Sequence, residues 1–191
     1  MKKTNYGKYQ HYSALIFVLA ILILSGCSKN NSSDAHTDVH ENFKTVGVIN
    51  FVGYPNTEAP QFRLTDQNGK ELTDENMKSK VYIIQGYSFG CSSCAQEVAS
   101  LNKVWEKYKG KGIEIISMDL FSEDMESAME TKKLYNGGDW HWTLDNDDVA
   151  VKFAMASLET TLIVDKDGII RYKDEIISNA DDLSKEIDKL I

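Results

Sequence analysis

Apolar and polar positions along the chain predict strands and helices in turn. Short apolar runs bounded by turn residues indicate buried strands, and apolar residues spaced by three or four positions indicate helices. The predicted strands lie at 81–85, 113–118, 161–164 and 169–172, and the predicted helices at 91–109, 123–134, 149–153 and 181–191. This order predicts an α/β fold, with a central mixed β-sheet flanked by helices on both faces.

An extra N-terminal β-hairpin is predicted ahead of this alternation. The short apolar segments 62–64 and 71–72 flank Asp66-Gln67-Asn68-Gly69. Asn-Gly is a typical turn dipeptide because both residues tolerate a positive φ. We therefore expect the two segments to pair as antiparallel strands.

The predicted helix at 91–109 has a regular apolar stripe. Its apolar residues recur at spacings of four, three, four and three, namely Cys94, Val98, Leu101, Trp105 and Tyr108. Gln96 and Glu97 are expected on the other faces of the helix. Cys94 therefore begins the buried face, whereas Cys91 is expected at the exposed tip.

Cys91-Ser92-Ser93-Cys94 follows a predicted strand and opens a helix. The unpaired N–H groups and the positive dipole at a helix N-terminus favour the thiolate of Cys91, and the thiolate is the nucleophilic form. This placement predicts a redox-active pair, in which Cys91 attacks and Cys94 resolves the mixed disulfide. The alternatives are an inert disulfide or half of a zinc site, but the chain has no second cysteine pair. We predict no cofactor and no resident metal.

The N-terminus has the pattern of an export signal. Three lysines precede an apolar run at 14–24, which is too short to span a hydrocarbon core of roughly 30 Å. Leu24-Ser25-Gly26-Cys27 resembles the lipobox of prokaryotic lipoproteins. We therefore expect a signal peptide at 1–26, a lipidated Cys27 with a flexible tether to residue 43, and one domain at 44–191. The domain would then be anchored outside the cytoplasm, at the outer face of the cell membrane or in the periplasm.

The charge of the chain argues against nucleic acid as a partner. The formal net charge is −8, and it falls to −11 when the lysines of residues 1–26 are removed. An acidic surface is repelled by phosphate backbones.

From about Ala59 to its end, the chain resembles the thioredoxin-like redoxins, in particular the exported TlpA/ResA type. The resemblance is carried by segment 59–66, by Asn68-Gly69-Lys70, by the Cys-x-x-Cys and by segment 160–168. It implies a thioredoxin-like fold and thiol-disulfide exchange with an exported client protein and a redox-partner protein. The family also has an acid three residues after the second cysteine, matched here by Glu97. Such an acid assists proton transfer or only stabilises the helix dipole.

The chain departs from this family at two places. Where the family has a cis-proline, in a loop that faces the cysteines, this chain has Glu159 between Leu158 and Thr160. A cis bond before a residue other than proline costs roughly 2.5–4 kcal/mol, so we expect a trans bond and a differently shaped substrate loop. A carboxylate near Cys91 would raise its pKa. Gly90 replaces the family's frequent tryptophan and predicts a less apolar rim.

Two alternative functions come from sister families. Tyr87-Ser88-Phe89-Gly90-Cys91 looks like the approach to a peroxidatic cysteine, which suggests a thiol peroxidase of the AhpC/TSA peroxiredoxin type. That alternative lacks the peroxiredoxin proline, and only Arg63 and Arg171 are available to hold a peroxide. A Sco-like metal chaperone would need a third ligand, from His141 or Glu159.

The segment Trp140-His141-Trp142 is predicted to pack in the core. The tryptophans would lie on one side and His141 on the other if the segment is extended.

Overall fold

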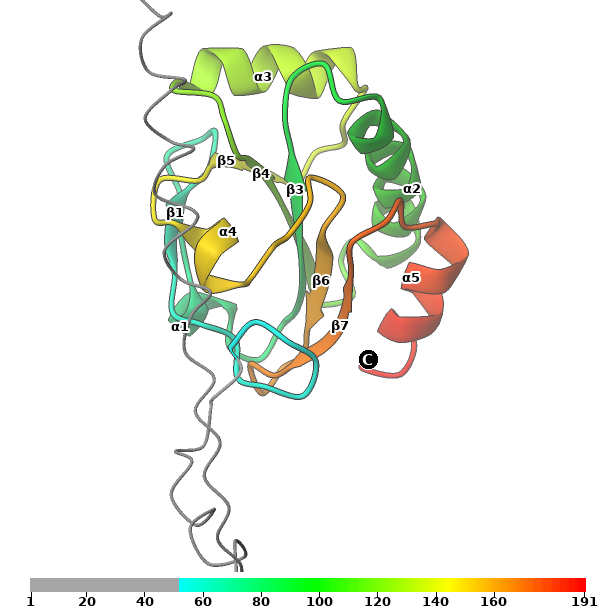
Figure 1. The fold of residues 1–191 in the computed structure, drawn as a ribbon. Coiled ribbons are helices and arrows are strands. Elements are labelled where there is room, and N and C mark those ends of the chain that lie inside the picture. The colour runs from blue at the N-terminus through cyan, green and yellow to red at the C-terminus, as the bar shows by residue number, and fades with distance from the viewer. Residues whose placement is uncertain (1–51) are drawn as a thin grey trace, which may run out of the picture. The chain divides into compact units, whose positions relative to one another are not determined.

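A five-stranded mixed β-sheet organises the domain, in the order β5-β4-β3-β6-β7. The computed structural model describes residues 52–191. β3 pairs in parallel with β4, which pairs in parallel with β5, whereas β6 runs antiparallel to both β3 and β7. Figure 1 shows α2 and α5 on one side of this sheet and the hairpin strand β1 with α1 and α4 on the other. The predicted α/β class and mixed sheet are confirmed.

The elements follow the sequence prediction closely. The strands are β1 (Arg63–Thr65), β2 (Glu71–Thr73), β3 (Val81–Tyr87), β4 (Ile113–Asp119), β5 (His141–Leu144), β6 (Thr161–Val164) and β7 (Ile170–Asp174). The helices are α1 (Asp74–Met77), α2 (Ser92–Tyr108), α3 (Met125–Leu134), α4 (Val149–Lys152) and α5 (Ala180–Ile187). The predicted hairpin is confirmed as β1 and β2. The sequence prediction left out α1 and did not assign β5.

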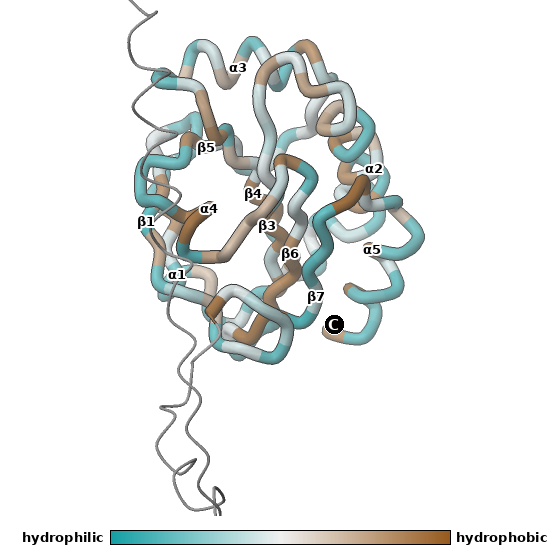
Figure 2. Tube along the Cα trace, viewed as in Figure 1, coloured by the Kyte–Doolittle hydropathy of each residue, from teal (hydrophilic) through white to brown (hydrophobic). Residues whose placement is uncertain are grey.

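The sheet separates two apolar cores because successive side chains of a strand point to opposite faces. On one face, Ile83 and Ile163 pack against α2 and α5. On the other, Tyr82 and Leu162 pack against the hairpin, α1 and α4. Figure 2 shows the apolar stretches concentrated on the central strands, with more polar residues along the outer helices.

The buried stripe of α2 differs from its prediction at three positions. Val104 is fully buried, whereas Trp105 is only partly buried against the core. Glu97, expected on an outer face, is fully buried as well. Cys94, Val98, Leu101 and Tyr108 are buried as predicted.

The hairpin docks on β5, the edge strand of the sheet. Gln67 N–H donates to the Trp142 carbonyl at 3.0 Å, and Trp142 N–H donates to Gln67 Oε1 at 2.8 Å. The turn is held by Asp66, whose Oδ1 accepts the N–H groups of Asn68 and Lys70, each at 2.9 Å. These bonds use backbone groups of an edge strand that would otherwise be open to pairing with another chain.

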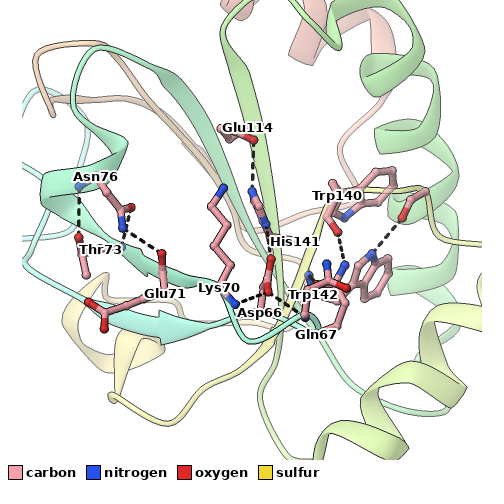
Figure 3. Close-up of polar contacts among 12 residues, drawn as sticks. Asp66, Gln67, Lys70, Glu71, Thr73, Asn76, Glu114, Trp140, His141 and Trp142 are labelled. Carbon is pink, nitrogen blue, oxygen red and sulfur yellow. Dashed lines mark hydrogen bonds and ion pairs between the residues drawn. The ribbon is translucent and has the colours of Figure 1, made fainter.

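His141 connects the hairpin to the sheet on the side opposite the tryptophans, as Figure 3 shows. Its Nδ1 lies 2.8 Å from Asp66 Oδ2, and its Nε2 lies 3.2 Å from Glu114 Oε2. Lys80 Nζ donates to Glu114 Oε1 at 2.8 Å. Trp140 and Trp142 are buried in the core that includes α2. The predicted packing of the Trp-His-Trp segment is therefore confirmed.

Glu114 should make the fold sensitive to acid. The hydrogen bond with His141 is the largest cause that lowers its pKa from 4.5 to about 2. A carboxylate with a depressed pKa stabilises the fold above its unfolded value, so this stability is present above pH 4.5 and is lost as pH falls through about 2. We expect Glu114→Gln to lower the free energy of unfolding by about 2 kcal/mol at neutral pH. The variant should also show a smaller loss of stability at low pH, which is the acid limb of the profile.

Urea unfolding between pH 2 and pH 7 measures this effect. Glu186→Gln removes a carboxylate of α5 that pairs with Lys189, serves as the control, and should leave the acid limb in place. Equal acid limbs for wild type and Glu114→Gln would contradict the assignment.

No helix among residues 52–191 combines the length and the apolar character that crossing a membrane requires. The predicted signal peptide at 1–26, Cys27, the tether to residue 43 and the start of the domain at 44 lie outside the described residues.

Candidate active site around Cys91 and Cys94

Cys91 stands at the junction between β3 and α2, where it is the N-cap residue of the helix. The turn that leads into it includes Gly90, whose φ of 77° favours glycine. Cys91 and Cys94 form a disulfide with their Cα atoms 5.3 Å apart. Cys91 is partly exposed, whereas Cys94 is fully buried. A client thiol or disulfide can therefore reach the first sulfur and not the second.

The helix N-terminus contacts the first sulfur directly. Cys94 N–H donates to Cys91 Sγ at 3.1 Å. The first turn of α2 contains no acidic residue. Both features favour negative charge on Cys91 when the disulfide opens, because a backbone N–H and the helix dipole stabilise a thiolate there.

Tyr135, the C-cap residue of α3, braces the loop before Cys91. Its hydroxyl donates to the Ser88 carbonyl at 2.7 Å and accepts Cys91 N–H at 2.9 Å. Burial raises the pKa of this tyrosine, so the hydroxyl stays protonated and can make both bonds. Sequence reasoning missed Tyr135, since a tyrosine 44 residues after Cys91 gives no local signal.

Glu97 lies one helical turn after Cys94, on the buried side of α2. Thr161 Oγ1 donates to Glu97 Oε1 at 2.5 Å, whereas the buried Oε2 makes no hydrogen bond among the described residues. Burial raises the pKa of Glu97 to about 8. Glu97 can therefore hold a proton at neutral pH and release it at a slightly higher pH.

Asp174, at the end of β7, is a second acid on this side of the sheet. It pairs across the strands with Thr161, and its charge adds to the causes that raise the pKa of Glu97. Its Oδ2 accepts from the hydroxyls of Tyr172 and Ser178 at 2.5 and 2.8 Å. Burial raises its own pKa. The sequence reasoning did not single out Asp174.

The loop Leu158–Thr160 reaches the start of α2. Leu158 packs against the same core as Cys91, and Thr160 is buried with its hydroxyl donating to the Ser157 carbonyl at 2.8 Å. Glu159 Oε1 accepts the Ser93 hydroxyl at 2.5 Å. Ser93 Oγ in turn lies 3.2 Å from Cys91 Sγ. The described chain contains no cis peptide bond, which confirms the predicted trans bond between Leu158 and Glu159.

Three exposed apolar side chains lie in the segments that follow β3, β4 and β7. These strands finish at the same end of the sheet, where Cys91 lies. Phe89 follows β3 and is 69% exposed, Phe121 follows β4 and is 73% exposed, and Ile176 follows β7 and is 71% exposed. Gly90 itself adds no apolar side chain to this end of the sheet, but Phe89 places an exposed aromatic ring one residue earlier.

The other residues considered for this site are engaged elsewhere. His141 contacts Asp66 and Glu114. Arg63 pairs with Glu71 on the hairpin, and Arg171 Nε donates to Asp165 Oδ2 at 2.5 Å. Within residues 52–191, no group of three or more histidine, cysteine, aspartate or glutamate side chains is placed to hold a metal ion.

Curated relatives of similar sequence are thiol-disulfide oxidoreductases by name. ResA of Bacillus thuringiensis is 29% identical over 112 residues, which are 58% of this chain and 64% of the relative. ResA of Bacillus subtilis is 26% identical over 113 residues, covering 59% of this chain and 62% of the relative. The chain thus spans less than two thirds of the length of these relatives.

Solved structures show the same fold. A putative thiol:disulfide interchange protein DsbE from Chlorobium tepidum superposes with a TM-score of 0.64 at 18% identity, covering 72% of this chain and 97% of that one. The thioredoxin domain of a thiol-disulfide oxidoreductase from Bacteroides vulgatus gives a TM-score of 0.62 at 23% identity, covering 71% and 96%. The predicted thioredoxin-like fold is confirmed.

The sequence model of the AhpC/TSA family matches residues 55–173, which is more than half of the chain and includes both cysteines. With the thioredoxin-like fold and a cysteine pair at the start of α2, the chain belongs to the AhpC/TSA family.

Proposed function

We propose that this protein is a membrane-anchored, extracytoplasmic thiol-disulfide oxidoreductase that uses the Cys91–Cys94 pair. The observation that carries the proposal is the unequal exposure of the two sulfurs at the N-terminus of α2. The names of the ResA relatives support the same activity.

The exchange has two steps in the direction that reduces a client. The Cys91 thiolate attacks one sulfur of the client disulfide, which forms a mixed disulfide and releases the other client sulfur as a thiolate. The Cys94 thiolate then attacks Cys91 Sγ, forms the Cys91–Cys94 disulfide and releases the second client thiolate. Two electrons pass to the client, and a dithiol of the redox-partner protein restores the pair. Oxidation of a client dithiol is the same sequence in reverse.

Glu97 supplies the proton chemistry of the buried sulfur in this proposal. Cys94 has no access to water in the folded protein, so a nearby group must take its proton before it can resolve the mixed disulfide. Glu97 lies on the same buried side of α2. With a pKa of about 8, a minor fraction of Glu97 is ionised near neutral pH, and this carboxylate can accept the proton of the thiol.

The client would dock on the rim formed by Phe89, Phe121 and Ile176, together with the loop Leu158–Thr160. These exposed apolar side chains would contact apolar residues beside the client disulfide. The acidic character of the chain agrees with a protein client and disfavours nucleic acid.

The anchor rests on the lipobox-like segment that ends at Cys27. We expect Cys27→Ala to block lipid attachment and to move the protein from the membrane fraction, or to leave the signal uncleaved. Stable anchoring needs more than one acyl chain, since each buried CH₂ contributes about 0.8 kcal/mol. Mass spectrometry of the native N-terminal peptide checks this, and an unmodified Cys27 thiol in membrane-extracted protein would contradict it.

The peroxidase alternative is less well supported by the site. Both arginines of the chain form ion pairs away from the cysteines, so neither is placed to hold a peroxide. The metal-chaperone alternative lacks His141, which is held by two carboxylates. Three assays on one reduced sample separate these functions: reduction of insulin disulfides, consumption of hydrogen peroxide, and stoichiometric binding of copper. Peroxide consumption without insulin reduction would overturn the proposal.

A further inference from the structure

We propose that Glu159 and Ser93 together restrain ionisation of Cys91 and so bias the pair toward reducing client disulfides. This inference rests on the proposed function for its biological meaning, but its physical part concerns only the three side chains. Glu159 is a positioning residue here, because it acts on the reacting sulfur through Ser93.

The geometry is a chain of two contacts across the start of α2. The Ser93 hydroxyl carries one hydrogen, and it is donated to Glu159 Oε1 at 2.5 Å. The Ser93 oxygen, with its lone pairs, therefore faces Cys91 Sγ at 3.2 Å. A thiolate at Cys91 would therefore face an oxygen lone pair. A hydroxyl hydrogen at that position would have stabilised the thiolate.

The charge of Glu159 acts in the same direction. The hydrogen bond from Ser93 is the main cause that lowers the pKa of Glu159, so its carboxylate is ionised at neutral pH. A negative charge close to a thiol disfavours the second negative charge of a thiolate.

Other groups near Cys91 also affect the stability of its thiolate. Cys94 N–H and the dipole of α2 favour the thiolate. Tyr135 contacts Cys91 through the backbone N–H and stays neutral, and Glu97 is buried beyond Cys94. Asp119, at the end of β4, is a further acid, which contributes to the raised pKa values of Tyr87 and Tyr135. Among these acids, Glu159 is the one whose carboxylate is linked to Cys91 Sγ through one intervening side chain, that of Ser93.

The restraint has a redox consequence. A dithiol protein is a strong oxidant when its reduced form is stabilised, chiefly as a thiolate. Interactions that destabilise the Cys91 thiolate therefore favour the disulfide form and make the reduced pair a better electron donor. In this direction, two electrons pass from the two thiols to the client disulfide, as in the exchange described above.

The pH profile of Cys91 alkylation in the reduced full-length protein tests this. We expect Glu159→Gln to lower the apparent pKa of Cys91 by about one unit. Below that pKa the thiolate fraction rises tenfold, and the weaker nucleophilicity of a less basic thiolate reduces the gain in rate to about threefold. The reduction potential at pH 9 should rise by up to about 30 mV, which is a tenfold change in the exchange constant.

Two further variants make the test specific. Glu123→Gln removes one charge from an exposed position after β4 and should leave the profile unchanged. In a Ser93→Ala background, Glu159→Gln should shift the pKa by less than half as much, because the connecting hydroxyl is absent. An unchanged pKa in Glu159→Gln, or an equal shift with and without Ser93, would overturn the inference. Failure of the proposed function would appear separately, as a wild-type protein that alkylates normally but does not exchange disulfides.

Discussion

Replacing Cys91 with serine should abolish disulfide exchange, whereas replacing Cys94 with serine should stop the reaction at a mixed disulfide. Cys91 is the sulfur that a client can reach, and without it the buried Cys94 has no access to the client. Without Cys94, the attacking thiol remains but nothing inside the protein resolves the product. Non-reducing electrophoresis after incubation with a disulfide-containing client measures the trapped species.

Ser92→Ala is the matched control, because Ser92 lies between the cysteines with an exposed side chain. It should retain the exchange activity of the wild type. A client adduct in Cys91→Ser and none in Cys94→Ser would show that the roles of the two sulfurs are reversed.

Glu97→Gln should make the protein more stable above neutral pH and slower in exchange. The pKa of Glu97 is raised from 4.5 to about 8 by burial. Between these values the folded chain keeps a proton that the unfolded chain releases, so the free energy of unfolding falls as pH rises, by up to about 1.4 kcal/mol per pH unit. Glutamine removes this slope while it keeps the size of the side chain and its ability to accept from Thr161.

The activity of the same variant should fall roughly a hundredfold, a magnitude typical of losing a group that transfers a proton. Urea unfolding and insulin reduction, both followed from pH 5 to pH 9, measure the two effects. Glu106→Gln on the exposed face of α2 is the control and should change neither. Unchanged exchange kinetics in Glu97→Gln would leave Glu97 with a structural role only.

The parts that sequence predicted well are those with strong local signals. The Asn68-Gly69 turn, the apolar run that becomes β3 and the spacing of Cys94, Val98 and Leu101 each depend on neighbours within a few residues. α1 was missed because its capping box pairs Thr73 with Asn76, in place of the more typical glutamate or glutamine. β5 was missed because a short segment rich in tryptophan gives no clear period.

The environment of each site residue depended on contacts that no local pattern encodes. Glu97 looks like an outer residue in a helical projection, but Thr161 and Asp174 come from distant strands and enclose it. The position of Glu159 near the cysteines was predicted from the family's loop, whereas its link through Ser93 required the geometry of both elements. His141 was considered as a metal ligand because its carboxylate partners, from the hairpin turn and β4, are remote in sequence.

The order in which the two thiols react distinguishes the attacking sulfur from the resolving sulfur. The reduced protein is treated with less than one equivalent of iodoacetamide, digested, and analysed by mass spectrometry for the modified cysteine. We expect modification of Cys91 before Cys94, because Cys91 is partly exposed at the N-terminus of α2 and Cys94 is fully buried. Modification of Cys94 first, or equal modification of both, would contradict it.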